Sequence, residues 1–198
     1  MTRRQWRNPN TGLELYYGLG TISGATGTWE WFGHSGGFQG YISRTCNYPA
    51  QELTVSVLTN AVDGWAGLWG DGVVHIMQAF ARNGAPDRKT KDWSGRFWSL
   101  WGAVDLLPMG DKVLAITPGF INPFPEASEI AITGRSTGRI ASAPGFSSHG
   151  EPVRCTRAKS GKITELWLAG SKLLPAAKVA KEMEARYGTL RKNRKSAS

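Results

Sequence analysis

The segment with the clearest chemical potential is His34-Ser35-Gly36-Gly37. An imidazole and a hydroxyl stand beside two adjacent glycines, at the end of an aromatic stretch that predicts a strand. Adjacent glycines weaken a strand, because glycine loses the most backbone entropy on folding. They are favoured where another molecule lies close against the backbone. The main-chain N–H of Gly37 would then face a substrate carbonyl as an oxyanion donor. The tetrapeptide alone leaves open a glycine bulge or a hairpin turn.

The two other histidines do not add to this site. His75 falls within a helical pattern and His149 within a polar turn, where a structural role is the default interpretation. The three histidines and two cysteines have no metal-ligand spacing, so we expect neither a metal nor a cofactor. Cys46 and Cys155 are expected to be free and buried, although the sequence leaves their redox state open.

The elements around the tetrapeptide predict a short antiparallel meander followed by a helix. Strand signals cover residues 13–20, 28–33, 38–46 and 53–59. From Trp65 to Ala81, apolar side chains recur at three- and four-residue steps, as in an amphipathic helix. One helix covers one face of a sheet. We therefore expect the other face to expose apolar surface, including Trp29 or Trp31 and Phe32.

A second unit follows a polar stretch that resembles a linker. Short apolar runs alternate with Gly, Pro or Asp at a spacing that suggests an antiparallel barrel or sandwich. The runs span residues 96–101, 103–107, 112–117, 129–133, 139–143, 152–157 and 163–168. Residues 176–187 are rich in alanine and predict a terminal helix that ends at Gly188. The predicted fold class is α+β: an antiparallel meander plus helix, then a small antiparallel barrel with a C-terminal helix.

The first unit resembles a known family through several motifs that agree in order and spacing. The motifs are Tyr17-Gly18-Leu19-Gly20, a glycine-rich loop, residues 33–41 (GHSGGFQGY), a hairpin with Pro49, and Val57-Leu58-Thr59-Asn60. Together they resemble the C-terminal part of the β-lactamase-related serine hydrolases: class C β-lactamases, D-Ala-D-Ala carboxypeptidases, D-aminopeptidases and esterases. The resemblance implies a partial β-lactamase-like sheet.

The resemblance also implies roles for the tetrapeptide. His34, Ser35 and Gly36 match the His-x-Gly variant of the family's third motif, which is more typical of peptidases and esterases than of true β-lactamases. They would contact the substrate, a small amide or ester, and Gly37 N–H would be the oxyanion donor. The family's nucleophile motif, Ser-x-x-Lys, has no counterpart in this chain, and neither does Tyr-x-Asn or Ser-x-Asn. The chain alone is therefore expected to be inactive.

The second unit resembles the lipocalin-like barrel appended to many such hydrolases. The resemblance rests on Gly95-Arg96-Phe97, Asp111-Lys112, residues 150–154 (GEPVR) and residues 161–166 (GKITEL). The expected organisation is a C-terminal piece of a β-lactamase-like hydrolase domain over 1–84, a linker over 85–92, a lipocalin-like barrel with its helix over 93–188, and a basic disordered tail over 189–198. The opening residues read as though the chain were cut from a larger protein.

Three classes of function remain in competition. The first is a fragment of a penicillin-recognising serine hydrolase, whose partner is the missing N-terminal catalytic portion or a second copy bound through the exposed sheet. The second is a non-enzymatic barrel that binds a small ligand or partner. The third is nucleic-acid binding, because most of the net charge of +9 lies beyond residue 90. A solvated tail explains that charge more simply, and we expect no nucleic-acid partner.

The sequence contains no signal that indicates where the protein is located. It contains no apolar stretch of the length of a membrane helix, and residues 1–20 lack the apolar core of a signal peptide. Localisation is therefore unknown, since a parent protein would be exported or cytoplasmic according to segments that precede Met1.

Overall fold

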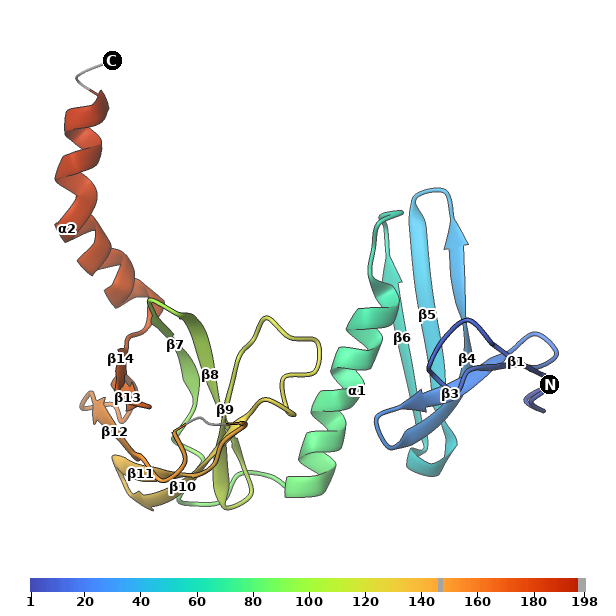
Figure 1. Cartoon of the computed structure of the whole chain (residues 1–198), viewed down its shortest axis with the longest axis horizontal. Helices are drawn as coiled ribbons and strands as arrows, with labels where there is room; N and C mark the ends of the chain where they lie inside the picture. Colours follow the sequence, from blue (N-terminus) through green and yellow to red (C-terminus); the bar gives the residue numbers. More distant parts are fainter. Residues whose placement is uncertain (146–147, 196–198) are drawn as a thin grey trace. The chain divides into compact units, whose positions relative to one another are not determined.

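The computed structural model describes residues 1–145 and 148–195, with only the backbone described over 189–195. The chain divides into two compact units, Met1–Ala81 and Arg82–Ser198, and each contains one antiparallel sheet (Figure 1). Within the described residues, no helix is both long enough and apolar enough to cross a membrane. The predicted fold class is confirmed: a meander with a helix, then a small barrel with a C-terminal helix.

The first unit is a six-stranded sheet whose strands follow one another in chain order, β1 to β6. Such a meander forms when each strand reverses directly onto the next through a short connection. The strands are β1 (Trp6–Arg7), β2 (Tyr16–Tyr17), β3 (Ile22–Thr26), β4 (Trp29–Phe38), β5 (Tyr41–Tyr48) and β6 (Leu53–Thr59), with a 3₁₀ turn η1 (Pro49–Gln51) between β5 and β6.

Two expectations for this sheet were wrong. The strand predicted over residues 38–46 is interrupted, because β4 ends at Phe38 and the chain reverses at Gln39-Gly40. Gly40 has φ +86°, a left-handed conformation that favours glycine and suits a two-residue hairpin turn. The glycine-rich loop expected after Gly20 contains strand β3, in which a Cβ at Gly24 would lie only 3.0 Å from the Trp31 ring.

Helix α1 (Ala66–Asn83) covers one face of this sheet. The side of the helix that packs on the sheet is not the side that carries its large apolar residues. Its buried residues are mostly small: Ala66, Gly70, Val74, Gln78 and Ala79. A Cβ at Gly70 would lie 3.8 Å from Val57 of β6, so small residues let the helix approach the sheet closely. The bulky apolar side chains lie on the exposed side: Trp65, Leu68, Trp69, Val73, Ile76 and Met77.

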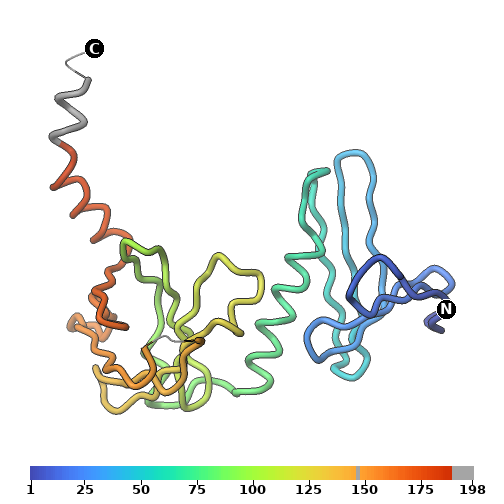
Figure 2. The backbone as a smooth tube through the Cα atoms, viewed as in Figure 1, coloured from blue at the N-terminus to red at the C-terminus, as the bar shows by residue number. Residues whose placement is uncertain are grey.

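The second unit is an eight-stranded sheet in the order β14 to β7 that curls into a nearly closed barrel. Its strands are β7 (Gly95–Ser99), β8 (Gly102–Met109), β9 (Lys112–Ile116), β10 (Ser128–Gly134), β11 (Thr137–Ser142), β12 (Pro152–Arg157), β13 (Ile163–Leu168) and β14 (Ser171–Leu173). The two ends of the sheet meet at an isolated bridge between Trp98 of β7 and Leu174, the residue after β14, whose backbones exchange hydrogen bonds of 2.8 and 3.0 Å. Figure 2 traces this path from β7 round to the end of β14.

The interior of the barrel is packed with its own side chains. Val113, Ile130, Val153 and Leu166 are fully buried and belong to one continuous apolar cluster that also contains Phe97. Buried residues alternate with exposed ones along β11 and β12, as expected when one face of each strand points inward. The described part of the barrel thus contains one continuous apolar cluster of its own side chains.

Two features of the second unit differ from expectation. Strand β14 is only three residues long and was not predicted. Helix α2 (Ala176–Lys195) does not end at Gly188 but continues to Lys195. Gly188 does not take the left-handed conformation that ends many helices, and interior glycine costs only about 1 kcal/mol relative to alanine. Residues 196–198 of the expected tail lie outside the described residues.

Candidate functional site

The tetrapeptide occupies the C-terminal half of β4, which has a strand on one side only. Strand β5 pairs with β4 as far as Phe38, but β3 pairs with it only as far as Gly33. Beyond Gly33, the described residues place no strand on the β3 side of β4. Residues 34–38 therefore have an open backbone edge.

The register decides which backbone groups face that edge. The two-residue turn at Gly27-Thr28 makes Thr26 and Trp29 a hydrogen-bonded pair, so alternate residues of β4 point their N–H and C=O groups toward β3. Trp29, Trp31 and Gly33 have this phase, and Ser35 and Gly37 continue it. The N–H groups of Ser35 and Gly37 thus point away from β5, into the open edge.

His34 is held by two hydrogen bonds. Its Nε2 lies 3.0 Å from the hydroxyl oxygen of Tyr17, and its Nδ1 lies 2.5 Å from the carbonyl oxygen of Ser35. A carbonyl only accepts, so Nδ1 carries the hydrogen and Nε2 accepts one from the Tyr17 hydroxyl. The two rings also meet edge to face, with centroids 5.8 Å apart. Neither imidazole nitrogen is bound to Ser35 Oγ, so these two residues do not form a nucleophile–base pair.

Ser35 is tied instead to an arginine on the neighbouring strand. Nη1 of Arg44 donates to Ser35 Oγ at 3.1 Å, and Nε of Arg44 donates to Sγ of Cys46 at 3.0 Å. The guanidinium lies over the Trp31 ring, 4.2 Å from its centroid. These contacts hold the positive charge of Arg44 beside Ser35, on the face of the sheet that α1 covers.

The thiol of Cys46 is not an activated nucleophile. Burial raises the pKa of Cys46 above its ordinary value, and this outweighs the lowering by the Arg44 charge and its hydrogen bond. Burial likewise raises the pKa of Tyr48 to about 12, against the hydrogen bond that its hydroxyl donates to Thr26. Both groups are neutral near pH 7. Cys46 and Cys155 are both free and buried in the structure, as expected.

The three glycines of this strand differ in how much the fold needs them. A Cβ at Gly33 would overlap the main-chain carbonyl oxygen of Thr45, so the strand pair requires glycine there. At Gly36 a Cβ would meet only the mobile hydroxyl of Ser43, and at Gly37 it would lie 3.5 Å from the Ile42 side chain, an ordinary contact. Packing within this chain therefore explains Gly33 but does not explain Gly37.

The sheet face opposite α1 exposes apolar side chains, although not all of those expected. Trp31 is only 4% exposed because it packs under α1, and Trp29 and Phe32 are half-buried. The exposed residues are Phe38 (78%), Tyr41 (62%) and Leu58 (79%). The β4–β5–β6 register puts these three on the face that carries His34 and Gly36.

The structure thus brings His34, Ser35, Gly36 and Gly37 to one open strand edge. Tyr17 and Arg44 were not predicted as partners of these residues. Tyr17 belongs to one of the motifs on which the resemblance rests, but no spacing rule connects it to His34 across the sheet. Arg44 is the cross-strand partner of Ser35, a relation that becomes visible only once the hairpin register is known.

Comparison with known proteins gives distant similarities only. No protein-family model and no curated protein matches the sequence. The octameric penicillin-binding protein homologue from Pyrococcus abyssi aligns with a TM-score of 0.37 and 16% identity, over 88% of this chain and 40% of that one. SurE aligns with a TM-score of 0.33 and 17% identity, over 85% and 40%. SurE with D-Leu aligns with 0.30 and 16%, over 87% and 42%. The chain therefore spans about two fifths of the length of these solved structures.

Proposed function

We propose that Met1–Ala81 is the C-terminal piece of a penicillin-recognising serine hydrolase of the peptidase or esterase type. In this proposal it supplies the oxyanion-side strand, and a separate segment supplies the serine nucleophile. Gly37 N–H is the oxyanion donor, and His34, Ser35 and Gly36 contact a small amide or ester substrate. Arg82–Ser198 is the lipocalin-like barrel appended to that hydrolase.

The observation that carries the proposal is the open edge of β4 at Gly37. Its N–H points into the edge that β3 leaves unpaired beyond Gly33, in a strand that β5 holds on the other side, and such a fixed main-chain donor is what an oxyanion site requires. Glycine at this position is not required by the chain's own packing, so the approach of another molecule is a reason for its presence.

A second observation supports completion of this unit by another segment. Trp69, Val73 and Ile76 form an exposed apolar stripe on α1, and Trp65, directly before the helix, continues it. Phe38, Tyr41 and Leu58 are exposed on the opposite sheet face. Both faces of one small unit thus present apolar surface, which is typical of sites that bind another polypeptide. Under this proposal the missing catalytic portion covers them.

The test compares two variants of Gly37 in a reconstituted enzyme. A segment that is encoded upstream of Met1 and contains Ser-x-x-Lys is coexpressed with this chain, and hydrolysis of p-nitrophenyl acetate and of D-amino-acid amides is measured. Gly37→Pro removes the N–H at a strand edge where proline is tolerated, and should lower kcat about 100-fold or more. Gly37→Ala keeps the N–H and is the matched control.

Three results would contradict the proposal. The first is equal activity of the two Gly37 variants, and the second is an upstream region without Ser-x-x-Lys. The third is a reaction of the chain alone. The proposal expects that the chain alone hydrolyses neither p-nitrophenyl acetate nor nitrocefin and is not labelled by a fluorescent penicillin. Stoichiometric acylation of one of its own serines, detected by mass spectrometry, would show that the nucleophile lies within these residues.

A further inference from the structure

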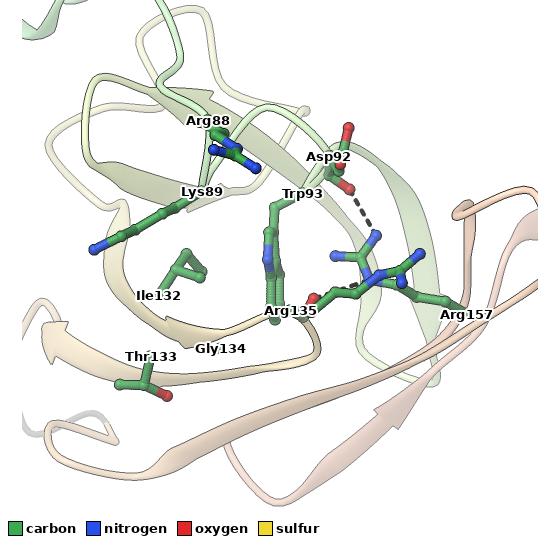
Figure 3. A pocket seen from close by; sticks show the side chains of 9 residues that line it. All are labelled: Arg88, Lys89, Asp92, Trp93, Ile132, Thr133, Gly134, Arg135 and Arg157. Atoms are coloured by element: carbon green, nitrogen blue, oxygen red, sulfur yellow. Dashed lines mark hydrogen bonds between the residues drawn. The ribbon is translucent and has the colours of Figure 1, made fainter.

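The second unit contains a basic pocket that the proposed hydrolase site does not use. It has a volume of about 550 Å³ and lies beside the barrel, between the segment that leads into β7 and the β10–β11 turn. Figure 3 shows its lining residues: Arg88, Lys89, Asp92, Trp93, Ile132, Thr133, Gly134, Arg135 and Arg157. Four of these side chains are cationic and one is anionic.

Arg157 is anchored by main-chain carbonyls, and one of its guanidinium nitrogens has no acceptor among the described residues. Its Nε donates to the carbonyl oxygen of Arg135 at 3.0 Å, and its Nη1 donates to those of Asp92 and Gly161 at 2.9 and 2.8 Å. Nη2 is buried and has no acceptor among the described residues. Three carbonyl bonds thus hold the side chain in place without neutralising it, since a carbonyl carries no net charge.

Trp93 provides a second donor without a partner. Its side chain is 1% exposed, and its Nε1 finds no acceptor among the described residues. The Arg157 guanidinium carbon lies 5.2 Å from the Trp93 ring centroid, and Figure 3 shows the ring between Ile132 and Arg157. Buried indole N–H groups normally have a partner, so two orphaned donors lining one pocket point to a ligand that carries acceptors.

The charge of the lining indicates what kind of acceptor. None of the ion pairs among the described residues engages Arg88, Lys89, Arg135 or Arg157. Cationic donors form their strongest hydrogen bonds with carboxylate and phosphate oxygens. The Trp93 ring and Ile132 add apolar wall, and the pocket is larger than a bare inorganic anion needs.

We propose that this pocket binds a small organic anion. Its carboxylate or phosphate group accepts hydrogen bonds from Nε1 of Trp93 and Nη2 of Arg157, and its apolar part lies against Trp93 and Ile132. Arg135, Arg88 and Lys89 contribute positive charge at the rim. The site belongs to the barrel alone, and its function is independent of the strand edge at Gly37.

The test follows the Trp93 indole N–H by ¹⁵N–¹H NMR during titration of the full chain. Phenyl phosphate and benzoate are the anionic probes, benzamide is the neutral counterpart of benzoate, and inorganic phosphate tests the anion alone. Phenyl phosphate or benzoate should shift the Trp93 signal saturably, and benzamide should not. The Trp93 signal is identified by its loss in Trp93→Phe.

Charge-removing variants separate a site from general attraction. Arg135→Gln should weaken binding of the responding probe about tenfold, as expected for the loss of one charge-assisted interaction. Arg154→Gln removes the same charge from an exposed residue of β12 outside the pocket, and should leave affinity unchanged. Arg135 is exposed, so its replacement is not expected to disturb folding.

Four outcomes would overturn the proposal. These are no shift of the Trp93 signal with either anionic probe, an equal shift with benzamide, equal weakening by Arg135→Gln and Arg154→Gln, or a response to inorganic phosphate alone. A response to only one of phenyl phosphate and benzoate supports the proposal and identifies the anionic group. None of these results depends on hydrolytic activity.

Discussion

The hydroxyl of Tyr17 donates to Nε2 of His34 at 3.0 Å and thereby defines the tautomer of an exposed imidazole. With Nε2 accepting and Nδ1 donating to the Ser35 carbonyl, the ring presents no free N–H. The open edge of β4 therefore offers main-chain N–H donors, while the imidazole beside it offers none.

Replacing Tyr17 by Phe should release this tautomer. In the wild-type chain the neutral ring should carry its hydrogen on Nδ1, and in Tyr17→Phe a larger fraction should carry it on Nε2, because that nitrogen no longer accepts a hydrogen bond. Long-range ¹H–¹⁵N NMR of the imidazole at mildly alkaline pH measures the two forms. The free energy of unfolding should change by no more than about 1 kcal/mol, since the pair is exposed. An unchanged tautomer ratio would disprove the assignment.

Gly33→Ala and Gly37→Ala should differ in their effect on stability. At position 33 the new methyl group meets the Thr45 backbone, so the strand pair must move, at a cost of about 1–3 kcal/mol or more. At position 37 the methyl group has room, and the change should lie within about 0.5 kcal/mol. Urea denaturation of the two variants measures the difference. Similar losses in both would mean that the β4–β5 register is not the one described.

The first unit should lose stability at alkaline pH through Tyr48. Its pKa is about 12 in the folded chain against 10.0 for the ordinary group, so the folded state holds its proton more tightly than the unfolded state. The contribution of Tyr48 to the free energy of unfolding is fully present below pH 10.0. It is lost as pH rises toward about 12, by up to about 3 kcal/mol. Hydrogen exchange in β5 as a function of pH measures this loss.

Tyr48→Phe is the control for that titration. It removes the ionisable group and the hydrogen bond to Thr26, so it should lower stability by about 1 kcal/mol near neutral pH. It should also flatten the loss above pH 10.0. Because burial also raises the pKa of Cys46, a smaller alkaline loss with the same sign should remain in this variant. A variant with the full wild-type alkaline slope would contradict the role of Tyr48.

Thr90 should be important for the start of the second unit. Its side chain is fully buried, and its hydroxyl donates to the carbonyl oxygen of Gly110 at 2.7 Å. The hydroxyl oxygen of Thr90 accepts from the N–H of Asp87 at 3.1 Å. Thr90→Val keeps the shape but removes both bonds of the hydroxyl. The N–H of Asp87 still donates to the carbonyl oxygen of Gly110 at 3.0 Å, so the change should cost about 1 kcal/mol. The exposed Thr137→Val should change the stability by less than about 0.5 kcal/mol in the same thermal unfolding experiment.

The sequence predicted the elements better than their relations. The spacing of apolar runs and turn residues located most barrel strands within a few residues, because period-two alternation and glycine turns are local signals. Strand β14 escaped notice because three residues are too few for a pattern. The pairing of Trp98 with Leu174 depends on closure of the whole barrel, which no local signal records.

For α1 the local pattern predicted the helix but not which of its sides packs on the sheet. The recurrence of large apolar residues predicted a helix, and α1 is one, but the side that packs on the sheet is the one with Ala66, Gly70 and Val74. Periodicity identifies an apolar face without identifying what covers it. The pocket at Trp93 was missed for a similar reason: its cations are distributed between residues 88 and 157 and meet only in the folded barrel.

The closure at Trp98 and Leu174 also has a consequence for the order of synthesis. In the meander of the first unit each strand pairs with its immediate successor. Each new strand that leaves the ribosome can therefore pair at once with the strand synthesised before it. The barrel cannot be completed until residue 174 has left the exit tunnel. Until then β7 presents a bare edge to the nascent chain's surroundings, which is when this protein is most exposed to mispairing with its neighbours.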